Sequence, residues 1–351
     1  MNKVVLIGVL NWGMGHASRS VPVIEAVLRY GADVVIASMG ASKTFLEQRF
    51  PHVNVLEIPD REISYGKSGA AIGLLKRSFQ QQKINKDQYA WLTQNAEDLG
   101  ITHIISDNLY GFNNPTIPSA IITHQVGIVS PFFKSRFDKY MASWLSKFNE
   151  VWIPDEPGEF SLAGKMLANA FYDGKLFYLG HISRFRKMPA AEKDIDYLAI
   201  LSGPEPQRTF LENKIAKKLN KLPGRHVIVR GRIDSDAIPT SDRIEYYSFL
   251  HEKRLENFIS RCKVVICRSG YTSILDMVQM GTKACFIPTP QQPEQKYLAK
   301  RMKQKGWFHA VSQKDFGIKD LQKAAEQSTF QPSDFREKMD GVIYNFLRKS
   351  S

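Results

Sequence analysis

The chain alternates short apolar runs with segments whose apolar residues recur at helical spacing. Runs with the length and β-branched content of buried strands occupy residues 3–9, 32–37, 53–58, 101–106, 119–123, 151–153, 197–201, 226–229, 264–267 and 284–287. Helical spacing follows several of these runs and returns at residues 335–347. Strands that alternate with helices predict an α/β fold with parallel sheets, in which ligands bind where the strands end.

The first strand leads through a glycine-containing loop into a helix. Gly13 and Gly15 in this loop would let a ligand approach the backbone closely. The apolar residues expected on the buried face of the helix are Val21, Ile24 and Leu28. Because Pro22 is comfortable only in a first turn, the helix is expected to begin near residues 18–20 and to leave His16 in the loop.

Titratable and amide side chains follow the strands of the first half. His16 follows the first strand, Asp107 follows the run at 101–106, and His124 and Gln125 follow a later run. An imidazole suits proton transfer near neutral pH, and a neighbouring carboxylate can orient it and stabilise its charge. The alternatives are a histidine that caps the helix and an Asp107 that caps the next turn.

In the second half, the strand at 264–267 turns through Ser269 and Gly270 directly into a helical segment that contains Asp276. A helix that begins at such a turn presents unpaired N–H groups and its positive dipole end, which suits a phosphate. A carboxylate at Asp276 can accept hydrogen bonds from two neighbouring hydroxyls, such as those of a ribose. The alternative is an ordinary strand-to-helix unit with a serine cap.

Two further loops carry polar groups. The turn at 202–206 is a second candidate phosphate cradle, although its two prolines remove N–H donors. The turn at 288–295 brings Glu294 and Gln295 to a strand end, where amides and carboxylates can recognise sugar hydroxyls. A proline-rich solvated turn is the alternative for this segment.

Composition adds constraints on partners. At 351 residues, with 43% hydrophobic and 24% charged residues, the chain has room for two globular α/β domains. A formal charge of +13 favours anionic partners, but no nucleic-acid-binding motif accompanies it. Three cysteines without paired or metal-type spacing indicate reduced thiols, and no apolar run is long enough for a signal peptide core or a membrane span.

We expect four segments along the chain. Residues 1–155 form the N-terminal domain, 156–196 a connecting segment and linker, 197–330 the C-terminal domain, and 331–351 a final helix. Within the first domain, residues 70–77 combine an apolar patch with two basic residues. This patch fits either a plain buried helix or a segment that seats on an anionic membrane surface or an apolar acceptor.

Taken in order, these motifs resemble GT-B nucleotide-sugar glycosyltransferases, and in particular glycosyltransferase family 28, which includes the peptidoglycan lipid N-acetylglucosaminyltransferase and the galactolipid synthases. The motifs that carry the resemblance are the loop histidine His16, His124-Gln125-x-Gly127, Gly180-x-x-x-Arg184, Arg268-Ser269-Gly270 with Asp276, and Gln295. The resemblance implies two Rossmann-like domains with mostly parallel sheets that face across a cleft, and a C-terminal helix at 331–351 that crosses back to the N-terminal domain. It also implies that the N-terminal domain lies on the acceptor side and that the C-terminal domain binds the donor.

The resemblance further implies an inverting, metal-independent hexosyltransferase that uses a UDP-sugar as donor substrate, without a cofactor, and a lipid or glycan hydroxyl as acceptor. His16 and Asp107 would be catalytic, and Gly13, Gly15, His124 and Gln125 would lie on the acceptor side. The residues implied in donor binding are Arg184, Gly203, Arg230, Phe249, Leu250, Arg268, Ser269, Gly270, Tyr271, Thr272, Asp276, Glu294 and Gln295. At Phe249 and Leu250 backbone groups would contact the base.

Two other functions fit part of the sequence. The spacing Gly-x-Gly-His-x-x-Arg, with Arg19 after His16, also resembles UDP-sugar hydrolases of similar fold, in which the histidine activates water; an epimerase is the related option. A nucleotide-sugar binding protein without catalysis is the third. The cysteines favour a cytoplasmic protein, and residues 70–77 together with the basic net charge motivate a separate hypothesis of peripheral attachment at the inner face of the membrane.

Overall fold

A computed structural model describes residues 3–59, 70–129, 134–188, 191–232, 241–330 and 334–349 of the chain, and the side chains of residues 70–79 lie outside this description. The chain divides into two compact units. The first unit comprises Met1–Ile182 together with Asp334–Ser351, and the second comprises Ser183–Ser333.

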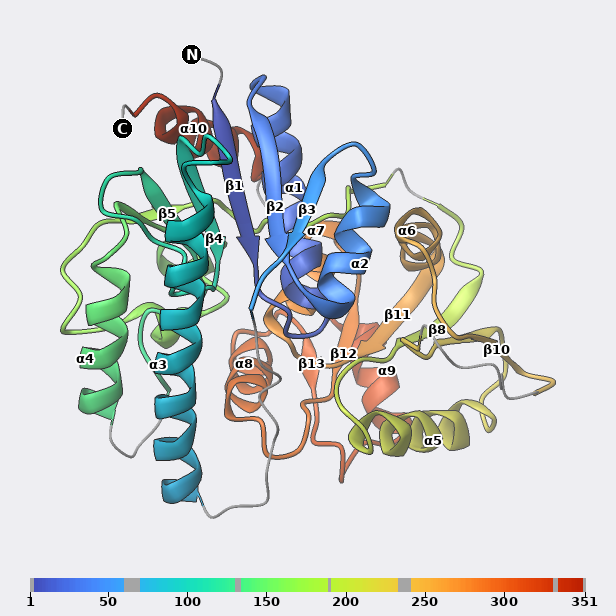
Figure 1. Ribbon diagram of the computed structural model, residues 1–351. Coiled ribbons are helices and arrows are strands. Elements are labelled where there is room, and N and C mark those ends of the chain that lie inside the picture. Colours follow the sequence, from blue (N-terminus) through green and yellow to red (C-terminus); the bar gives the residue numbers. More distant parts are fainter. Residues whose placement is uncertain are drawn as a thin grey trace. The chain divides into compact units, whose positions relative to one another are not determined.

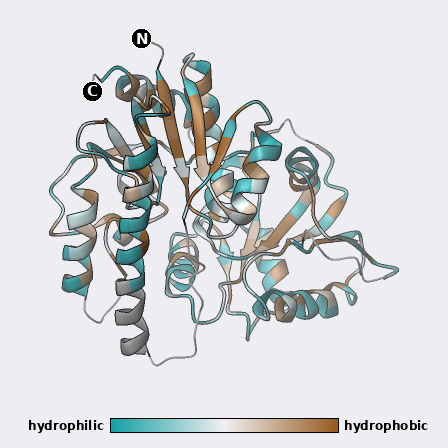
Figure 2. Cartoon of the chain, viewed as in Figure 1, coloured by the Kyte–Doolittle hydropathy of each residue, from teal (hydrophilic) through white to brown (hydrophobic). Residues whose placement is uncertain are grey.

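The first unit is built on a seven-stranded parallel sheet in the order β3-β2-β1-β4-β5-β6-β7 (Figure 1). Its strands are β1 (Val4–Val9), β2 (Asp33–Ser38), β3 (Asn54–Glu57), β4 (His103–Asp107), β5 (Ser119–Ile122), β6 (Glu150–Ile153) and β7 (Leu176–Tyr178). Its helices are α1 (Met14–Arg29), α2 (Gly40–Arg49), α3 (Ala70–Asn95), α4 (Lys134–Leu145) and α10 (Arg336–Leu347), with short 3-10 helices at Gly158–Phe160 and Gly164–Leu167. Apolar strands form the centre of this unit (Figure 2).

Helices cover both faces of this sheet. On one face, α1 and α10 pack on the sheet through a core that includes Val21, Ile24, Phe335 and Phe346. On the other face, Leu92 of α3 lies in a separate core with residues of β1 and β4. The ring of Phe346 meets that of Trp152 in β6 edge-on, with the ring centroids 5.2 Å apart. Lys3 donates to the Leu347 carbonyl, so the two ends of the chain lie together in this unit (Figure 1).

The second unit contains a six-stranded parallel sheet in the order β10-β9-β8-β11-β12-β13. Its strands are β8 (Ile195–Ile200), β9 (His226–Val229), β10 (Ile244–Tyr247), β11 (Cys262–Cys267), β12 (Ala284–Phe286) and β13 (His309–Ala310). Its helices are α5 (Gln207–Leu219), α6 (Glu252–Arg261), α7 (Tyr271–Met280), α8 (Pro293–Gln304) and α9 (Ile318–Glu326). The α/β class predicted from the alternating pattern is therefore confirmed, and both sheets are parallel throughout the described strands.

Each sheet has one point at which the order of the strands reverses. In the first sheet, β1 pairs with β2 on one side and β4 on the other. In the second sheet, β8 pairs with β9 on one side and β11 on the other. Connections leave such a pair of strands toward opposite faces, and the crevice at their carboxyl ends is the usual ligand site of an open α/β sheet. The β1/β4 and β8/β11 pairs thus locate one candidate site in each unit.

The start of α1 differs from the prediction. The helix begins at Met14, so His16 lies in its first turn rather than in the loop, and Pro22 lies inside the helix. Its N-cap, Gly13, has a φ of 66°, a conformation that favours glycine. The proline removes one helical hydrogen bond, but the surrounding turns are buried almost throughout, and their burial offsets this loss.

One aliphatic side chain predicted to be buried is exposed. Leu28 is 38% exposed, whereas Val21 and Ile24, predicted on the same face of α1, are buried. Near the end of the helix, Val27 takes the buried position one residue earlier. Helical spacing was therefore recognised correctly, and only the last position of the buried face was wrong.

The two units are divided at Ile182 and Asp334, whereas the segments expected from the sequence end at residues 155, 196 and 330. The first unit runs on to Ile182, because β7 extends the first sheet beyond β6. Gly180 has a φ of 77°, and a Cβ there would lie 2.7 Å from the Cβ of Phe335. The absence of a side chain at Gly180 therefore allows the segment that leads into α10 to pack closely against it.

Three further sequence expectations concern the surface and the thiols. All three cysteines are buried and free. Among the helices of the described residues, none is both long and apolar enough to cross a membrane. The apolar patch at 70–77 falls in α3, where the side chains lie outside the described residues.

Candidate functional site

In the first unit, the candidate site lies at the carboxyl ends of three neighbouring strands. β1 leads through the loop after Val9 to His16 in α1, β4 ends on Asp107, and His124 follows β5. The register pairs Val9 with Asp107 and Asp107 with Ile122, which brings the three strand ends level. This register brings the side chains that follow the three strands to one edge of the sheet.

The carboxylate of Asp107 is fully buried and accepts hydrogen bonds from three side chains. Its Oδ1 lies 2.7 Å from Nδ1 of His16. Its Oδ2 accepts from Nε of Arg19 at 2.8 Å and from Oγ of Ser20 at 2.9 Å, and a second guanidinium nitrogen of Arg19 donates to Oδ1. A carboxylate can accept about four hydrogen bonds, so this group is fully satisfied as an anion. It joins the histidine instead of capping the next turn.

The charge states in this cluster follow from burial and from Arg19. Burial alone would raise the pKa of Asp107, but the charges of Arg19 and His16 and their hydrogen bonds outweigh it and lower the pKa far below its usual value. Burial, followed by the charge of Arg19, lowers the pKa of His16, while Asp107 opposes this shift. At neutral pH the pair is therefore a carboxylate beside a neutral imidazole.

The position of the proton on His16 follows from its neighbours. Nδ1 lies 2.7 Å from the carboxylate and 2.9 Å from a guanidinium nitrogen of Arg19, which can only donate. Because a buried carboxylate at the shorter distance requires a donor, we place the proton on Nδ1. Nε2 of His16 then carries a lone pair, and among the described residues it makes no hydrogen bond. This is the arrangement of a general base oriented by a carboxylate.

Arg19 is the member of the cluster whose role the sequence did not reveal. Its side chain is 1% exposed, and it lies one helical turn after His16 on the same face of α1. Besides Asp107 it reaches His124, with 3.0 Å between its nitrogen and Nδ1 of the imidazole. Ser20, which the sequence did not single out, has its hydroxyl oxygen 2.9 Å from both Oδ2 of Asp107 and the backbone carbonyl of His16, and the two acceptors share its single proton. The spacing of three and four residues from a helical histidine was the available signal.

The other residues predicted on the acceptor side lie around this cluster. Gly13 and Gly15 begin α1, and a Cβ at Gly13 would meet open space, so its backbone conformation is what requires glycine. Gln125 is partly exposed, and its backbone N–H is bonded to Oγ1 of Thr123. His124 is buried.

In the second unit, the candidate site lies at the start of α7, after β11. Gly270 is the N-cap of this helix, and a glycine has no side chain with which to cap it. Ser269 is fully buried, and its hydroxyl donates to the backbone carbonyl of Gln295 at 2.8 Å. The hydroxyl of Ser269 therefore links the start of α7 to α8 by a hydrogen bond. The feature of this site that suits an anion is the N-terminal end of α7, not the serine hydroxyl. The turn from strand into helix predicted at this point is confirmed.

Asp276 and Arg184 form a loosely coupled pair in this unit. Asp276 lies inside α7 and accepts a hydrogen bond from Oγ of Ser183 at 2.6 Å. Its other oxygen lies 3.8 Å from a guanidinium nitrogen of Arg184. Burial raises the pKa of Asp276, and Arg184 and Ser183 only partly oppose this shift. Ser183 was not predicted, and a short-range sequence pattern could not have revealed a partner this distant in the chain.

The side chains of two arginines predicted to contact the donor are bonded within the second unit. Arg268 is 1% exposed, and its guanidinium donates to the carbonyls of Gln207, Ile287 and Pro288 and to Oε1 of Gln313. Arg230 is buried, and its Nε lies 2.7 Å from Oε1 of Glu212. Both arginines follow a strand, a position where a ligand contact was expected. Their guanidinium groups instead bond to buried backbone carbonyls, to an amide oxygen and to a carboxylate of the protein.

The remaining donor-side candidates surround the start of α7. Gly203 has a φ of 98°, and a Cβ there would lie 3.7 Å from Oγ1 of Thr289. Oε1 of Gln295 accepts from the backbone N–H of Thr289 at 2.8 Å, so Gln295 braces the turn before α8. Partly exposed side chains are those of Thr272 and Glu294, whereas Tyr271 and Leu250 are buried and Phe249 is 37% exposed.

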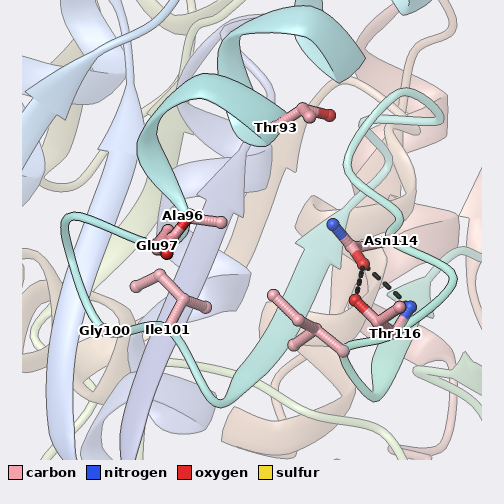
Figure 3. Close-up of a pocket in the computed structure, with 8 residues that line it drawn as sticks. Thr93, Ala96, Glu97, Gly100, Ile101, Asn114 and Thr116 are labelled. Atoms are coloured by element: carbon pink, nitrogen blue, oxygen red, sulfur yellow. Dashed lines mark hydrogen bonds between the residues drawn. The ribbon is translucent and has the colours of Figure 1, made fainter.

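Two searches of the described residues bear on other sites. No group of three or more His, Cys, Asp or Glu side chains in the described part of the chain is arranged to hold a metal ion. A pocket of about 270 Å³ lies beside Thr93, Asn114 and Thr116 (Figure 3). It is lined by Ile101 and Ile117, which precede β4 and β5, so it opens at the amino ends of these strands, away from Asp107.

Comparison with known proteins matches this architecture. Residues 210–350 match the family model for the glycosyltransferase family 28 C-terminal domain. A UDP-N-acetylglucosamine--N-acetylmuramyl-(pentapeptide) pyrophosphoryl-undecaprenol N-acetylglucosamine transferase from Caldanaerobacter subterraneus subsp. tengcongensis is 24% identical over an alignment that covers 30% of this chain and 30% of that relative's length. A protein named "Uncharacterized glycosyltransferase" from Methanosarcina acetivorans is 22% identical and is aligned over 88% of this chain and 85% of its own.

Among solved structures, the glycosyltransferase SnogD from Streptomyces nogalater superposes with a TM-score of 0.66 over 99% of each chain, at 10% identity. With two parallel Rossmann-like sheets, the protein has the GT-B fold of glycosyltransferases. Its C-terminal part is similar to the C-terminal domain of glycosyltransferase family 28, and the resemblance drawn from the sequence is confirmed.

Proposed function

We propose that this protein transfers a sugar from a UDP-sugar to a hydroxyl of a lipid or glycan acceptor, with inversion at the anomeric carbon. The observation that carries the proposal is the buried Asp107 carboxylate bonded to Nδ1 of His16, which leaves Nε2 as a base. The family 28 match in the second half supports a nucleotide sugar as donor. The name of the Caldanaerobacter relative supports UDP as its nucleotide.

The proposed reaction is a single displacement. The acceptor hydroxyl oxygen forms a bond to the anomeric carbon, and the bond from that carbon to the diphosphate oxygen breaks. The hydroxyl proton passes to Nε2 of His16, and the electron pair of the broken bond leaves with UDP. A positioned base of this kind contributes about 10²–10⁴-fold to a rate. Asp107 stabilises the imidazolium that forms and does not itself take the proton.

Charge stabilisation of the leaving diphosphate is assigned to the second unit. The start of α7 presents the positive end of the helix dipole, and Arg184 is 16% exposed and lies 3.8 Å from Asp276. We propose that Arg184 moves from Asp276 to the diphosphate when the donor binds, and that Asp276 then accepts from ribose hydroxyls. These groups supply positive charge without a metal, so the proposal requires activity that persists in excess EDTA.

The direct test is transfer of labelled sugar from a panel of UDP-sugars to lipid and glycan acceptors, with and without EDTA. Donors are first selected by protection against thermal unfolding, since a ligand that binds only the folded state raises its apparent stability. The proposal requires at least one UDP-sugar that both stabilises the protein and donates sugar, and a product of inverted anomeric configuration by NMR. A protein that no uridine diphosphate compound stabilises would contradict it.

Hydrolysis of the UDP-sugar is the second candidate, favoured by Arg19, which the spacing shared with UDP-sugar hydrolases places beside His16 and which contacts Asp107. In that reaction water replaces the acceptor hydroxyl. Incubation with the UDP-sugar alone separates the two: a hydrolase releases stoichiometric free sugar, whereas a transferase releases little until acceptor is added.

A further inference from the structure

Two arginines of the second unit converge on one carboxylate oxygen. Oε1 of Glu205 accepts from Nε and Nη2 of Arg208 at 3.0 and 2.9 Å, and from Nη2 of Arg232 at 3.3 Å. Its other oxygen, Oε2, accepts from the backbone N–H of Thr209, in the first turn of α5, at 3.2 Å. The carboxylate of Glu205 thus accepts from two guanidinium groups and a helix N–H, a set of donors that also suits a phosphate.

This cluster lies at the edge of the second sheet where ligands of an open α/β fold usually bind. Glu205 and Arg208 belong to the loop and helix that follow β8, and Arg232 follows β9. Gly231 has a φ of 66°, and a Cβ there would lie 2.3 Å from the carbonyl oxygen of Leu201, so glycine allows the two segments to approach closely. Nη1 of Arg208 donates to the Gly231 carbonyl at 2.7 Å. This bond links α5 to the segment after β9 and holds the cluster at the carboxyl ends of the two strands.

The three side chains are accessible to solvent. Their exposed fractions are 39% for Glu205, 19% for Arg208 and 31% for Arg232. Burial would raise the pKa of Glu205, but hydrogen bonds from Thr209 and Arg208 and the charge of Arg208 outweigh it and lower that pKa. Glu205 is therefore an anion at neutral pH, and its ion pairs are of the solvent-exposed kind, which contribute little and can be exchanged for a better partner.

We propose that Arg208 and Arg232 bind a phosphoryl group of a nucleoside diphosphate, and that Glu205 occupies this site as an internal competitor until the ligand displaces it. The inference rests on the proposed function and deepens it, because it adds two arginines to the groups assigned to donor binding. A phosphoryl group has more charge and more acceptor oxygens than a carboxylate, so it gains more from two guanidinium groups than Glu205 does. Pro204 and Pro206 remove N–H donors from the turn, and the arginines supply donors in their place.

The second unit contains a matched cluster at the opposite edge of the same sheet. There the carboxylate of Asp194 accepts from Nη1 of Arg225 at 2.6 Å and from Nε of Arg261 at 2.8 Å, and these side chains are exposed to a similar degree. Asp194 precedes β8, Arg225 precedes β9, and Arg261 precedes β11, so this cluster lies at the amino ends of the strands. Because the two clusters share their chemistry and differ in their edge of the sheet, Asp194→Asn is the matched control for Glu205→Gln.

Calorimetric titration with UDP and with inorganic pyrophosphate tests the proposal without turnover. Glu205→Gln should tighten the binding of UDP about 2- to 5-fold, because it removes the competing charge. Arg232→Gln should weaken it about 10-fold or more through the loss of a charged hydrogen bond, and Asp194→Asn should equal the wild type. Pyrophosphate lacks the nucleoside and should bind more weakly than UDP; pyrophosphate that binds as tightly would assign the site to a free anion and overturn the proposal.

The sign of the effect in Glu205→Gln is the decisive readout, since removal of a merely structural carboxylate would leave the affinity for UDP unchanged or lower it. Either of those results, or an unchanged affinity in Arg232→Gln, would refute the inference while sugar transfer by the wild type kept the function standing. Tighter binding in Glu205→Gln, in a protein that transfers no sugar, would leave the inference standing and refute the function. If Glu205→Gln does not fold, the titrations of Arg232→Gln and Asp194→Asn still decide the question.

Discussion

The two strand-reversal points of this protein are built differently. At β1/β4, the charged side chains Asp107 and Arg19 are buried and bonded to one another and to His16 and Ser20 at hydrogen-bond distance. At β8/β11, the N-cap of α7 is the glycine Gly270, and Arg184 and Asp276 form an ion pair with a separation of 3.8 Å. The first point is assembled before any ligand arrives, whereas the second retains charge that a ligand can engage.

This difference indicates how the work is divided. Proton transfer requires a base whose orientation and tautomer are fixed in advance, and the first point supplies these through side chains. Binding of a diphosphate requires donors and positive charge that are available, and the second point supplies these largely through backbone groups and one arginine. We therefore expect substitutions at the first point to lower kcat and substitutions at the second to raise the donor KM.

The largest effect is expected from Asp107→Asn. The variant leaves the guanidinium of Arg19 without its carboxylate in a buried place, which should cost about 3–5 kcal/mol in the free energy of unfolding. It also removes the group that sets the tautomer of His16, and kcat should fall about 10²–10⁴-fold. Urea denaturation and transfer assays measure the two effects. Asp138→Asn, at another buried carboxylate of the same unit, is the control and should spare kcat in the folded fraction.

Arg184→Gln should act on the donor. Loss of a charged hydrogen bond to the diphosphate corresponds to about 1.5–3 kcal/mol, or roughly a 10- to 100-fold increase in the donor KM, with the acceptor KM unchanged. Arg186→Gln, an exposed arginine close by in the chain, is the matched control. An Arg184→Gln enzyme whose donor KM equals that of the wild type would remove Arg184 from the donor site.

The pH dependence should sharpen the assignment of the base. Because burial and Arg19 lower the pKa of His16, the neutral form is present at pH 7, and kcat/KM should be level there and fall about 10-fold per pH unit only below the lowered pKa, which lies under 6.5. Asp107 opposes this shift, so its removal in Asp107→Asn should move the acid limb to still lower pH. An acid limb above pH 7 in the wild-type enzyme would contradict a buried neutral base.

The smallest effect is expected from Asp276→Asn. The amide keeps an oxygen for the Ser183 hydroxyl and removes a buried charge, so the free energy of unfolding at pH 7 should stay within about 1 kcal/mol of the wild type. Since burial raises the pKa of Asp276 in the folded state, wild-type stability should decline as pH rises through that pKa, and the variant should lack this decline. Urea denaturation across pH 4–8 measures the difference. A loss of several kcal/mol in the variant would show that the charge itself is structural.

Much of this division could be predicted from the sequence, because strand ends and glycine turns have local signals. Periodicity located the strands, and the rule that ligand groups follow parallel strands singled out His16, Asp107 and the start of α7. The start of α1 was misplaced because a proline rule applied in isolation overlooks burial along the whole helix.

The partners of the long cationic side chains could not be predicted. Arg19, Arg230 and Arg268 are all buried, yet Arg19 joins the cluster around Asp107 and the other two bond within the second unit. Which acceptor a guanidinium reaches depends on contacts between segments that are distant in the chain. Hydrophobic periodicity does not predict such contacts. For Arg19 alone, the i+3 spacing from a helical histidine offered a usable hint.

The most direct test of the account is a comparison of His16→Ala with the wild-type protein in two assays on the same preparation. Sugar transfer under saturating donor and acceptor should fall about 10²–10⁴-fold, while the affinity for the UDP-sugar, measured by calorimetry, should be unchanged. Transfer by His16→Ala at the wild-type rate, in a protein that still binds the donor, would contradict the claim that His16 is the base.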